Sequence, residues 1–457
     1  MYIKQIYTSC MSQASYYVES DNDCVIIDPL RDIEIYDDLI SKRGKNLKYV
    51  FETHFHADFI SGHIDLAKKY NSKIVFGPNA NPKYDVLVVK DNDELTLGKV
   101  KFKILHTPGH TMESICYLLI DEKNKEHSIY TGDTLFIGDV GRPDLASESI
   151  KSTEEMAGLL FDSLYKKIKQ LPDHVLVYPA HGKGTQCGKN LSSENHSTIG
   201  EQKLFNYALK FKSKSDFINS IISDIPSAPD YFKESVLKNS KGYDTLDLFL
   251  KESLKSNDLV EFDNLKDNSV IIDTRKSSDF AKGHIKDSIN IGLNGRYAIS
   301  AANLLNIKSK ILIVCNPGFE EESVIRLSRV GFDNILGFLK GGFNTWKNSG
   351  KSVENINRIN SNEIDSYNDY KIIDVRNFFE YNNGKIKNSL NIPLFDISSY
   401  LKKLDKKGDY LIHCETGYRS MIASSILKKN GFNNVIDISD GYQGYIKNSN
   451  VEVLNSL

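Results

Sequence analysis

Short apolar runs recur along the chain, and in its first half four of them end in residue types that bind metals. The runs cover residues 49–51, 100–105, 128–130 and 175–177, and histidine or aspartate follows each within a few positions. Their length is typical of β-strands. Since α/β sheets place their sites in loops at strand ends, the pattern predicts that these polar residues gather at one edge.

The last third of the chain repeats itself at a spacing of about 100 residues. Residues 271–275 (IIDTR) recur as 372–376 (IIDVR), and residues 331–334 (GFDN) recur as 431–434 (GFNN). This period is too long for a solenoid, so two copies indicate a duplicated small domain. Each copy alternates strand and helix patterns, which favours an α/β fold with a parallel sheet and helices on both faces.

Composition and charge narrow the possible partners. The 457 residues correspond to about three domains. The 58 basic and 60 acidic residues leave a net charge of −2. A chain with this balance lacks the positive field that would attract nucleic acid or an anionic membrane. No apolar run approaches the roughly 18 residues of a membrane span, and no signal sequence is visible, so we expect a cytoplasmic protein.

The polar residues after the four runs form a metal-binding pattern. His54, His56 and Asp58 follow the first run as H-x-H-x-D, a spacing that can turn three ligands toward one point. The later runs are followed by His110, Asp133 and His181. Imidazole and carboxylate together suit first-row metals. The spacing therefore predicts a metal site and leaves the metal open.

Three of these stretches resemble the metallo-β-lactamase superfamily, over about the first 240 residues: 53–58 (THFHAD), 106–111 (HTPGHT) and 130–136 (YTGDTLF). They look like the glyoxalase II and persulfide dioxygenase branch, which implies an αββα sandwich. In glyoxalase II a further histidine follows the aspartate and helps hold a second zinc, whereas this chain has Phe59. Because a phenyl ring cannot ligate, the mononuclear-iron branch fits better.

The resemblance implies that His54, His110 and Asp133 hold one Fe(II). Two imidazoles and one carboxylate form a facial triad with positions open for a sulfur ligand and O₂. His56, Asp58 and His181 then orient the ligands or handle protons. The alternative is that one or two of them bind a second metal.

Two further residues belong to this predicted site. Residues 138–144 (GDVGRPD) resemble a segment in which an arginine lines the substrate entrance, so Arg142 would suit a carboxylate or phosphate on the thiol carrier. Cys187 follows His181 on a glycine-rich loop and is a candidate to accept or pass a sulfane sulfur. The six cysteines lie far apart without a C-x-x-C pair, which is typical of reduced thiols.

The stretch 413–420 (HCETGYRS) follows an apolar strand and opens a helix from about Met421. Backbone N–H groups above a cysteine at a helix start favour a thiolate or persulfide anion. The C-x-x-G-x-R loop resembles rhodanese sulfurtransferases, over about residues 357–457. The resemblance implies that Cys414 is the nucleophile and Arg419 a fixed cation. The remaining predicted substrate-binding residues of this loop are Glu415, Thr416, Gly417 and Tyr418.

The first copy of the repeat departs from this pattern. It keeps Cys315 but has Glu320 where Arg419 stands in the second copy. A carboxylate at an anion cradle opposes a thiolate, so we expect this copy to be inactive, as a spacer or docking surface. The predicted domains are residues 1–243 (metallo-β-lactamase-like), 244–354 (inactive rhodanese-like) and 355–457 (active rhodanese).

This order of domains resembles persulfide dioxygenase–sulfurtransferase fusions. The resemblance implies that O₂ oxidises a persulfide of glutathione, coenzyme A or a similar thiol to sulfite, and that Cys414 then transfers sulfane sulfur to sulfite, giving thiosulfate. The expected role is sulfide detoxification. Two alternatives stay open: a glyoxalase II-like dinuclear zinc thioester hydrolase, and a non-enzymatic sulfur-relay or sensor scaffold. We expect a homo-oligomer, whose subunit number the sequence does not fix.

Overall fold

The computed structural model describes residues 1–145, 151–189, 191–223 and 225–448. The chain forms two compact units, the first of Met1–Leu248 with Ser328–Gly331 and the second of Phe249–Leu327 with Phe332–Leu457. None of the helices in the described ranges combines the length and the apolar character needed to cross a membrane.

Two six-stranded sheets form the centre of the first unit. The first sheet has the order β1 (Tyr2–Thr8), β2 (Gln13–Ser20), β3 (Asp23–Ile27), β4 (Asn46–Phe51), β5 (Lys73–Phe76), β6 (Leu87–Val88). The second has the order β12 (Ser197–Thr198), β11 (Leu176–Pro179), β10 (Glu126–Gly132), β9 (Ile115–Ile120), β8 (Val100–His106), β7 (Glu94–Leu97). The predicted runs thus lie in β4, β8, β10 and β11.

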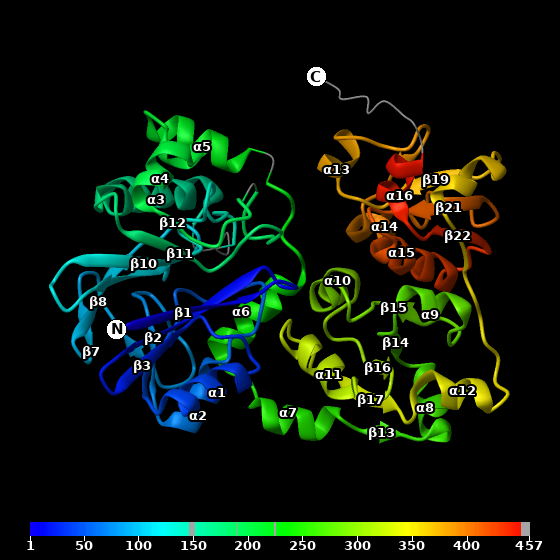
Figure 1. Ribbon diagram of the computed structural model, residues 1–457, viewed down its shortest axis with the longest axis horizontal. Coiled ribbons are helices and arrows are strands. Elements are labelled where there is room, and N and C mark those ends of the chain that lie inside the picture. The colour runs from blue at the N-terminus through cyan, green and yellow to red at the C-terminus, as the bar shows by residue number, and fades with distance from the viewer. Residues whose placement is uncertain (146–150, 190, 224, 449–457) are drawn as a thin grey trace. The chain divides into compact units, whose positions relative to one another are not determined.

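Helices cover the outer face of each sheet (Figure 1). Beside the first sheet lie α1 (Glu34–Arg43) and α2 (His63–Tyr70), and beside the second lie α3 (Thr153–Lys166), α4 (Ile199–Phe205) and α5 (Lys214–Ile222). The unit continues with α6 (Tyr231–Lys241), and α7 (Leu246–Ser253) begins at its end. Short 3₁₀ turns span Ile168–Gln170 and Tyr207–Leu209.

Alternation along the strands explains this layering. On β2, Tyr16 and Val18 belong to the apolar core between the sheets, together with Phe102 from the second sheet. The intervening Tyr17 belongs to the outer core, where Tyr36 of α1 packs. Because successive strand residues point to opposite faces, β2 contributes to both cores. The first unit is therefore the predicted αββα sandwich.

The second unit contains two five-stranded sheets whose described strand pairs are all parallel. The first has the order β13 (Ser256–Asn257), β17 (Ile335–Leu339), β16 (Ile311–Val314), β14 (Val270–Asp273), β15 (Ile289–Asn290). The other repeats it with β18 (Asn357–Ile359), β22 (Asn434–Ile438), β21 (Asp409–His413), β19 (Lys371–Asp374), β20 (Leu390–Asn391). This identical order confirms the duplicated α/β fold.

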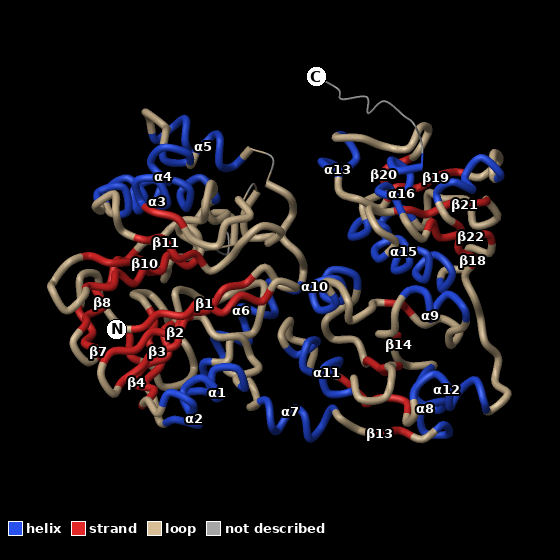
Figure 2. Tube along the Cα trace, in the orientation of Figure 1, coloured by secondary structure: helices blue, strands red, loops and turns tan. Residues whose placement is uncertain are grey.

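Helices flank the strands of both copies (Figure 2). The first copy has α8 (Leu259–Lys266), α9 (Ser277–Lys282), α10 (Tyr297–Leu304), α11 (Glu320–Ser328) and α12 (Gly342–Asn348). The second has α13 (Phe378–Asn382), α14 (Ile397–Tyr400), α15 (Tyr418–Lys429) and α16 (Gly441–Asn448), with 3₁₀ turns at Ser361–Ser366 and Leu394–Asp396.

The repeated Asp-x-Arg motif links a strand end to a turn in both copies. Arg376 donates to Asp374 at 2.7 Å and to the Gly384 carbonyl at 2.7 Å. In the first copy Arg275 makes the corresponding bonds, to Asp273 at 2.5 Å and to the Gly283 carbonyl at 2.9 Å. All four charged side chains are buried. The motif is thus a structural tether in the interior of each copy.

Candidate active sites

Loops that leave β4, β8, β10 and β11 bring the six predicted metal-site residues together in the first unit. His54, His56 and Asp58 follow β4, and the three later candidates follow the other strands. The end of β10 approaches the β4 loop closely at Gly132, which has a φ of 51°. A Cβ atom there would lie 2.4 Å from Oγ1 of Thr53. Only glycine fits both this backbone conformation and this approach.

His54, His110 and Asp133 each present one candidate ligand atom within 4.8 Å of the others. Oδ2 of Asp133 lies 3.3 Å from Nε2 of His110 and 3.9 Å from Nε2 of His54. The two imidazole rings meet edge to face at 4.9 Å between centroids. All three side chains are buried. The structure thus brings the predicted iron ligands together in the interior.

The polar atoms of this cluster suit a cation. Nε2 of both histidines and both carboxylate oxygens of Asp133 are buried without a hydrogen-bond partner in the part of the chain that the structure describes. Buried polar atoms without partners are costly, and a metal ion bound by one atom of each residue would satisfy both Nε2 atoms and one carboxylate oxygen. Burial, aided by the nearby histidines, lowers the pKa of His54 well below its ordinary value. Its imidazole is therefore neutral, the form that ligates metals.

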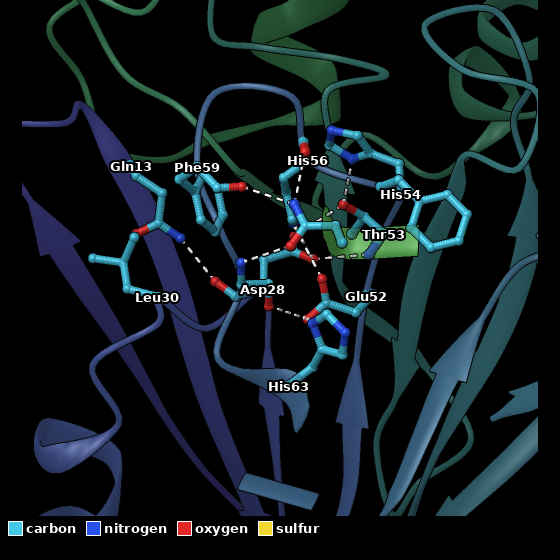
Figure 3. A network of polar contacts seen from close by, with 12 residues as sticks. Gln13, Asp28, Leu30, Glu52, Thr53, His54, His56, Phe59 and His63 are labelled. Carbon is cyan, nitrogen blue, oxygen red and sulfur yellow. Dashed lines mark hydrogen bonds and ion pairs between the residues drawn. The ribbon is translucent and has the colours of Figure 1, made fainter. Parts of the chain in front are cut away.

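Hydrogen bonds fix the orientation of both histidines, and the contacts of His54 are drawn in Figure 3. The Thr53 hydroxyl donates to Oδ2 of Asp28 at 2.9 Å and lies 2.9 Å from Nδ1 of His54. Nδ1 of His110 lies 2.9 Å from the Arg142 carbonyl oxygen, which can only accept. Both Nδ1 atoms are therefore assigned the proton, and both Nε2 lone pairs are left for a metal.

A second buried group of possible ligands lies beside the first. His56, Asp58 and His181 also present ligand atoms within 4.8 Å of one another. Nε2 of His181 lies 3.5 Å from Oδ2 of Asp58 and 3.5 Å from Oδ1 of Asp133, so the aspartate lies between the two groups. The adjacent Phe59 contributes only a hydrocarbon ring. Metal binding fits the site, and its donors suit either one or two ions.

Cys187 lies next to both groups. Its Sγ is within 4.8 Å of ligand atoms of Asp133 and His181. Burial, and then the charges of Asp58 and Asp133, raise the pKa of this thiol well above its ordinary value. The protein groups alone therefore keep Cys187 protonated. Its part in sulfur transfer stays a prediction.

The guanidinium group of Arg142 is engaged by an ion pair and hydrogen bonds with other residues of the chain. Its side chain is 6% exposed and forms a two-pronged ion pair with Asp144, at 2.7 Å for both contacts. A third bond runs to the Gln186 carbonyl at 3.2 Å. Arg142 contacts the metal cluster through its main-chain carbonyl oxygen, which lies 2.9 Å from Nδ1 of His110. The predicted role of the guanidinium in binding a thiol carrier stays a prediction.

Two carboxylates beneath the cluster were absent from the predicted site. Nε2 of His56 lies 3.1 Å from Oδ1 of Asp28 and 3.6 Å from Oε2 of Glu52 (Figure 3). Burial, and then the charge of Asp28, raise the pKa of Glu52 well above its ordinary value. The Ser61 hydroxyl donates to Glu52 at 2.7 Å. Both carboxylates directly follow apolar strands, so the signal that marked the other candidates was present here too.

The second copy of the repeat places Cys414 between β21 and α15. The helix begins at Tyr418, three residues before the expected Met421. Cys414 is 1% exposed, and the Gly417 N–H donates to its Sγ at 3.2 Å. Gly417 has a φ of 85°, and a Cβ atom there would lie 2.1 Å from the Ser439 carbonyl oxygen. Glycine is thus required to aim this N–H at the sulfur.

The charged residues of the loop are paired. Arg419, expected to be a fixed cation, donates to both carboxylate oxygens of Glu380, at 2.7 and 2.6 Å. Glu415 accepts from Arg376 at 3.1 Å and does not line the pocket above Cys414. The lining residues of this loop are Cys414, Thr416, Gly417, Tyr418 and Arg419.

The environment of Cys315 in the first copy opposes thiolate chemistry. Burial, and then the charges of Glu320 and Asp273, raise the pKa of Cys315 to about 12. The Glu320 carboxylate accepts from the Gly318 N–H at 2.7 Å, so it occupies an amide of the loop itself. The inactivity of this copy stays a prediction.

Comparison with known proteins agrees with the fold. The rhodanese-like domain family matches residues 258–349 and 356–448, and the metallo-beta-lactamase superfamily matches residues 9–80. A hydroxyacylglutathione hydrolase of Dictyostelium discoideum is 32% identical over 209 residues, which are 44% of this chain and 73% of that protein. A metallo-beta-lactamase structure from Staphylococcus aureus is 31% identical, with a TM-score of 0.65, and covers 74% of this chain and 98% of its own. The ETHE1 structure from Myxococcus xanthus is 29% identical, with a TM-score of 0.46, and covers 52% and 98%.

The two family matches and the hydroxyacylglutathione hydrolase relative define an enzyme with a metallo-β-lactamase fold followed by two rhodanese-like domains. The chain belongs to the metallo-β-lactamase superfamily.

Proposed function

We propose that this chain is a mononuclear non-haem Fe(II) persulfide dioxygenase coupled to a rhodanese sulfurtransferase. The main support is the cluster of His54, His110 and Asp133. Their Nε2 and carboxylate atoms face one another in the interior and have no hydrogen-bond partner among the described residues. Two histidines and one carboxylate with open positions are typical of non-haem Fe(II) oxygenases. The rhodanese-like domains support sulfur chemistry on the same chain.

The first reaction would be R–S–SH + O₂ + H₂O → R–SH + SO₃²⁻ + 2 H⁺. Bound Fe(II) would supply a site where a persulfide sulfur and O₂ meet. Thr53 and the Arg142 carbonyl hold the two histidines in the ligating tautomer. Asp58 and His181, 3.5 Å apart, would take up the released protons. The burial of the whole cluster restricts water.

The second reaction would take place at Cys414. Its thiolate would attack the outer sulfur of a second persulfide, and the electron pair of the broken S–S bond would leave with the thiol carrier. The Gly417 N–H, 3.2 Å from Sγ, stabilises negative charge on the sulfur. Sulfite would then remove the outer sulfur as thiosulfate and restore the Cys414 thiolate. Coupling of the two reactions would consume sulfite as it forms, and the proposed role is sulfide detoxification.

A dinuclear zinc thioester hydrolase is the second candidate. It is favoured by the hydroxyacylglutathione hydrolase relative and by the second cluster of His56, Asp58 and His181. In such an enzyme the metals would supply a hydroxide to attack a thioester. Phe59 argues against it, because this side chain removes one donor from the second site.

Metal analysis and O₂ uptake on the full-length protein distinguish the two. Protein purified without air is analysed for iron and zinc, then supplied with glutathione persulfide or with S-lactoylglutathione. We expect iron, O₂ consumption with the persulfide, and loss of that activity in His110→Ala. Zinc, with thioester hydrolysis and no O₂ uptake, would contradict the proposal.

The coupling is tested separately with Cys414→Ser. This variant should consume O₂ at the wild-type rate but release sulfite in place of thiosulfate. Unchanged thiosulfate release would refute a role of Cys414 in the second reaction. Cys315→Ser is the matched control in the first copy, and we expect it to leave both products unchanged.

A further inference from the structure

The pocket above Cys414 is built from both rhodanese copies. It has a volume of about 800 Å³. The second copy contributes the cysteine loop and residues around Glu380, and the first contributes Lys276, Asn294 and Arg296. A volume of this size suits an organic molecule. Sulfite or thiosulfate alone would leave most of it empty.

Direct contacts hold the first copy against the cysteine loop. The Tyr418 hydroxyl donates to the Gly292 carbonyl at 2.8 Å, and the Asn290 N–H donates to the Ser425 hydroxyl at 3.1 Å. At Gly295 a Cβ atom would lie 2.4 Å from the Tyr418 ring. The first copy thus forms a fitted wall of the pocket, although its own cysteine is unsuited to catalysis.

The charged side chains lining this pocket are mainly cationic. They are Lys276, Arg296, Arg358, Arg419 and a single carboxylate, Glu380. Glu380 pairs with Arg419, and Arg358 donates to Asp437 at 2.6 Å. Lys276 is exposed, and no carboxylate of the described residues lies within 4.0 Å of its ammonium group. Lys276 therefore adds positive charge to the pocket that these two ion pairs do not cancel.

The position of Lys276 is unfavourable for the fold itself. In the second copy the same repeat position holds Asn377, which accepts from the Glu380 N–H at 2.8 Å and caps α13. Lys276 precedes α9 without a side-chain capping bond. Capping residues stabilise a helix start, and a cation there opposes the helix dipole. A lysine in the place of a cap suggests a role other than stability.

We propose that the first rhodanese copy is the carrier-binding half of the sulfurtransferase site. Lys276, which lines the pocket, binds the carboxylates or phosphates of an organic thiol while the persulfide of that thiol reaches Cys414. This inference rests on the proposed function of Cys414 as the sulfur acceptor. In the reaction Cys–S⁻ + R–S–SH → Cys–S–SH + R–S⁻, the donor S–S bond breaks and a new one forms on Cys414. The anionic product R–S⁻ then leaves the pocket.

The test measures persulfide formation on Cys414 of the full-length protein, by rapid quench and mass spectrometry, with three donors. Glutathione persulfide carries carboxylates, coenzyme A persulfide carries phosphates, and mercaptoethanol persulfide has an uncharged body. Lys276→Glu should raise the half-saturating concentration of the charged donors by about tenfold, with little change in the maximal rate of persulfide formation. It should leave the uncharged donor within about twofold, and added salt should shrink the wild-type preference. The matched control is Lys282→Glu, at the other end of α9 and outside the lining.

The outcomes separate this inference from the function on which it rests. A larger loss with coenzyme A persulfide supports a phosphate-bearing carrier, and a larger loss with glutathione persulfide supports a carboxylate-bearing one. If Lys276→Glu and Lys282→Glu form the Cys414 persulfide at the same rates with all three donors, the inference is wrong while the sulfur-acceptor role of Cys414 stands. If no donor forms a persulfide on wild-type Cys414, both fail.

Discussion

The phenyl ring of Phe59 stacks on the imidazole ring of His56, with 4.2 Å between centroids and an interplanar angle of 27°. Phe59 is fully buried and directly follows the loop that carries the candidate ligands. It therefore fills space beside His56, Asp58 and His181 without offering a donor. This contact is the structural basis for expecting one metal ion in place of two.

Replacing Phe59 by histidine should restore a second metal. With a fourth donor in the second group, we expect about two zinc ions per chain after saturation and dialysis, against about one in the wild type. The measurement is the ratio of metal to protein. Phe59→Leu is the control, because it alters packing without adding a donor and should stay near one. Two ions in the wild type would show that the phenyl ring does not limit the site.

Thr53→Val should weaken the first metal site. The hydroxyl links Asp28 to Nδ1 of His54, so its loss leaves both atoms without that partner. We expect metal affinity to fall by about 10-fold to 100-fold, as for other groups that orient metal-bound histidines. Competition with a chelator measures this. Thr107→Val removes a buried hydroxyl bonded to Thr134 and should change the affinity much less.

The metal site was only partly predictable from the sequence. The histidines and aspartates after the strands carry distinctive residue types, and the fold brings them together because the strand ends meet. Asp28 and Glu52 follow the same rule, yet lone carboxylates are common after strands and their contacts with His56 depend on tertiary packing. The ion pairs of Arg142 with Asp144 and of Arg419 with Glu380 could not be predicted either. Which carboxylate an arginine reaches depends on the direction of its side chain in the folded protein.

The fold was more accessible to sequence reasoning than the sites. The repeat of Asp-x-Arg predicted two similar α/β domains, and the structure gives both the same strand order. The start of α15 was placed three residues late, because Tyr418 and Arg419 carry no capping signal and the left-handed Gly417 starts the helix. The pocket shared by the copies has no local signature, since Lys276 and Cys414 meet only through tertiary structure.

Alkylation of Cys315 should depend steeply on pH. With a pKa raised to about 12 by burial, Glu320 and Asp273, the reactive thiolate is scarce at neutral pH. Because the thiolate fraction grows tenfold per pH unit below the pKa, labelling by iodoacetamide should rise about tenfold per unit between pH 8 and 10. Peptide mapping by mass spectrometry measures the rate. Glu320→Gln removes one cause of the shift and should speed labelling at pH 9. A flat profile would contradict the assigned protonation state.

Arg275→Ala should strongly destabilise the first rhodanese copy. It leaves Asp273 buried without its ion-pair partner, a change that costs about 3–5 kcal/mol in buried pairs. Trp346, the single tryptophan of the chain, lies in the core of this copy and reports its unfolding by urea through fluorescence. Lys286→Ala, at an exposed position, should stay within about 0.5 kcal/mol of the wild type.

The loss of unfolding free energy caused by Arg275→Ala should be smaller at low pH. Burial already raises the pKa of Asp273 above its ordinary value in the presence of Arg275, and removal of the cation raises it further. A folded-state pKa above the unfolded one lowers stability where the carboxyl is ionised in the unfolded chain, and this penalty vanishes as pH falls below the unfolded value. The difference in unfolding free energy between variant and wild type should therefore be smaller at pH 5 than at pH 8. An equal difference at both would mean that the arginine acts through its packing on Phe343, where it lies 4.0 Å above the ring, and not through its charge.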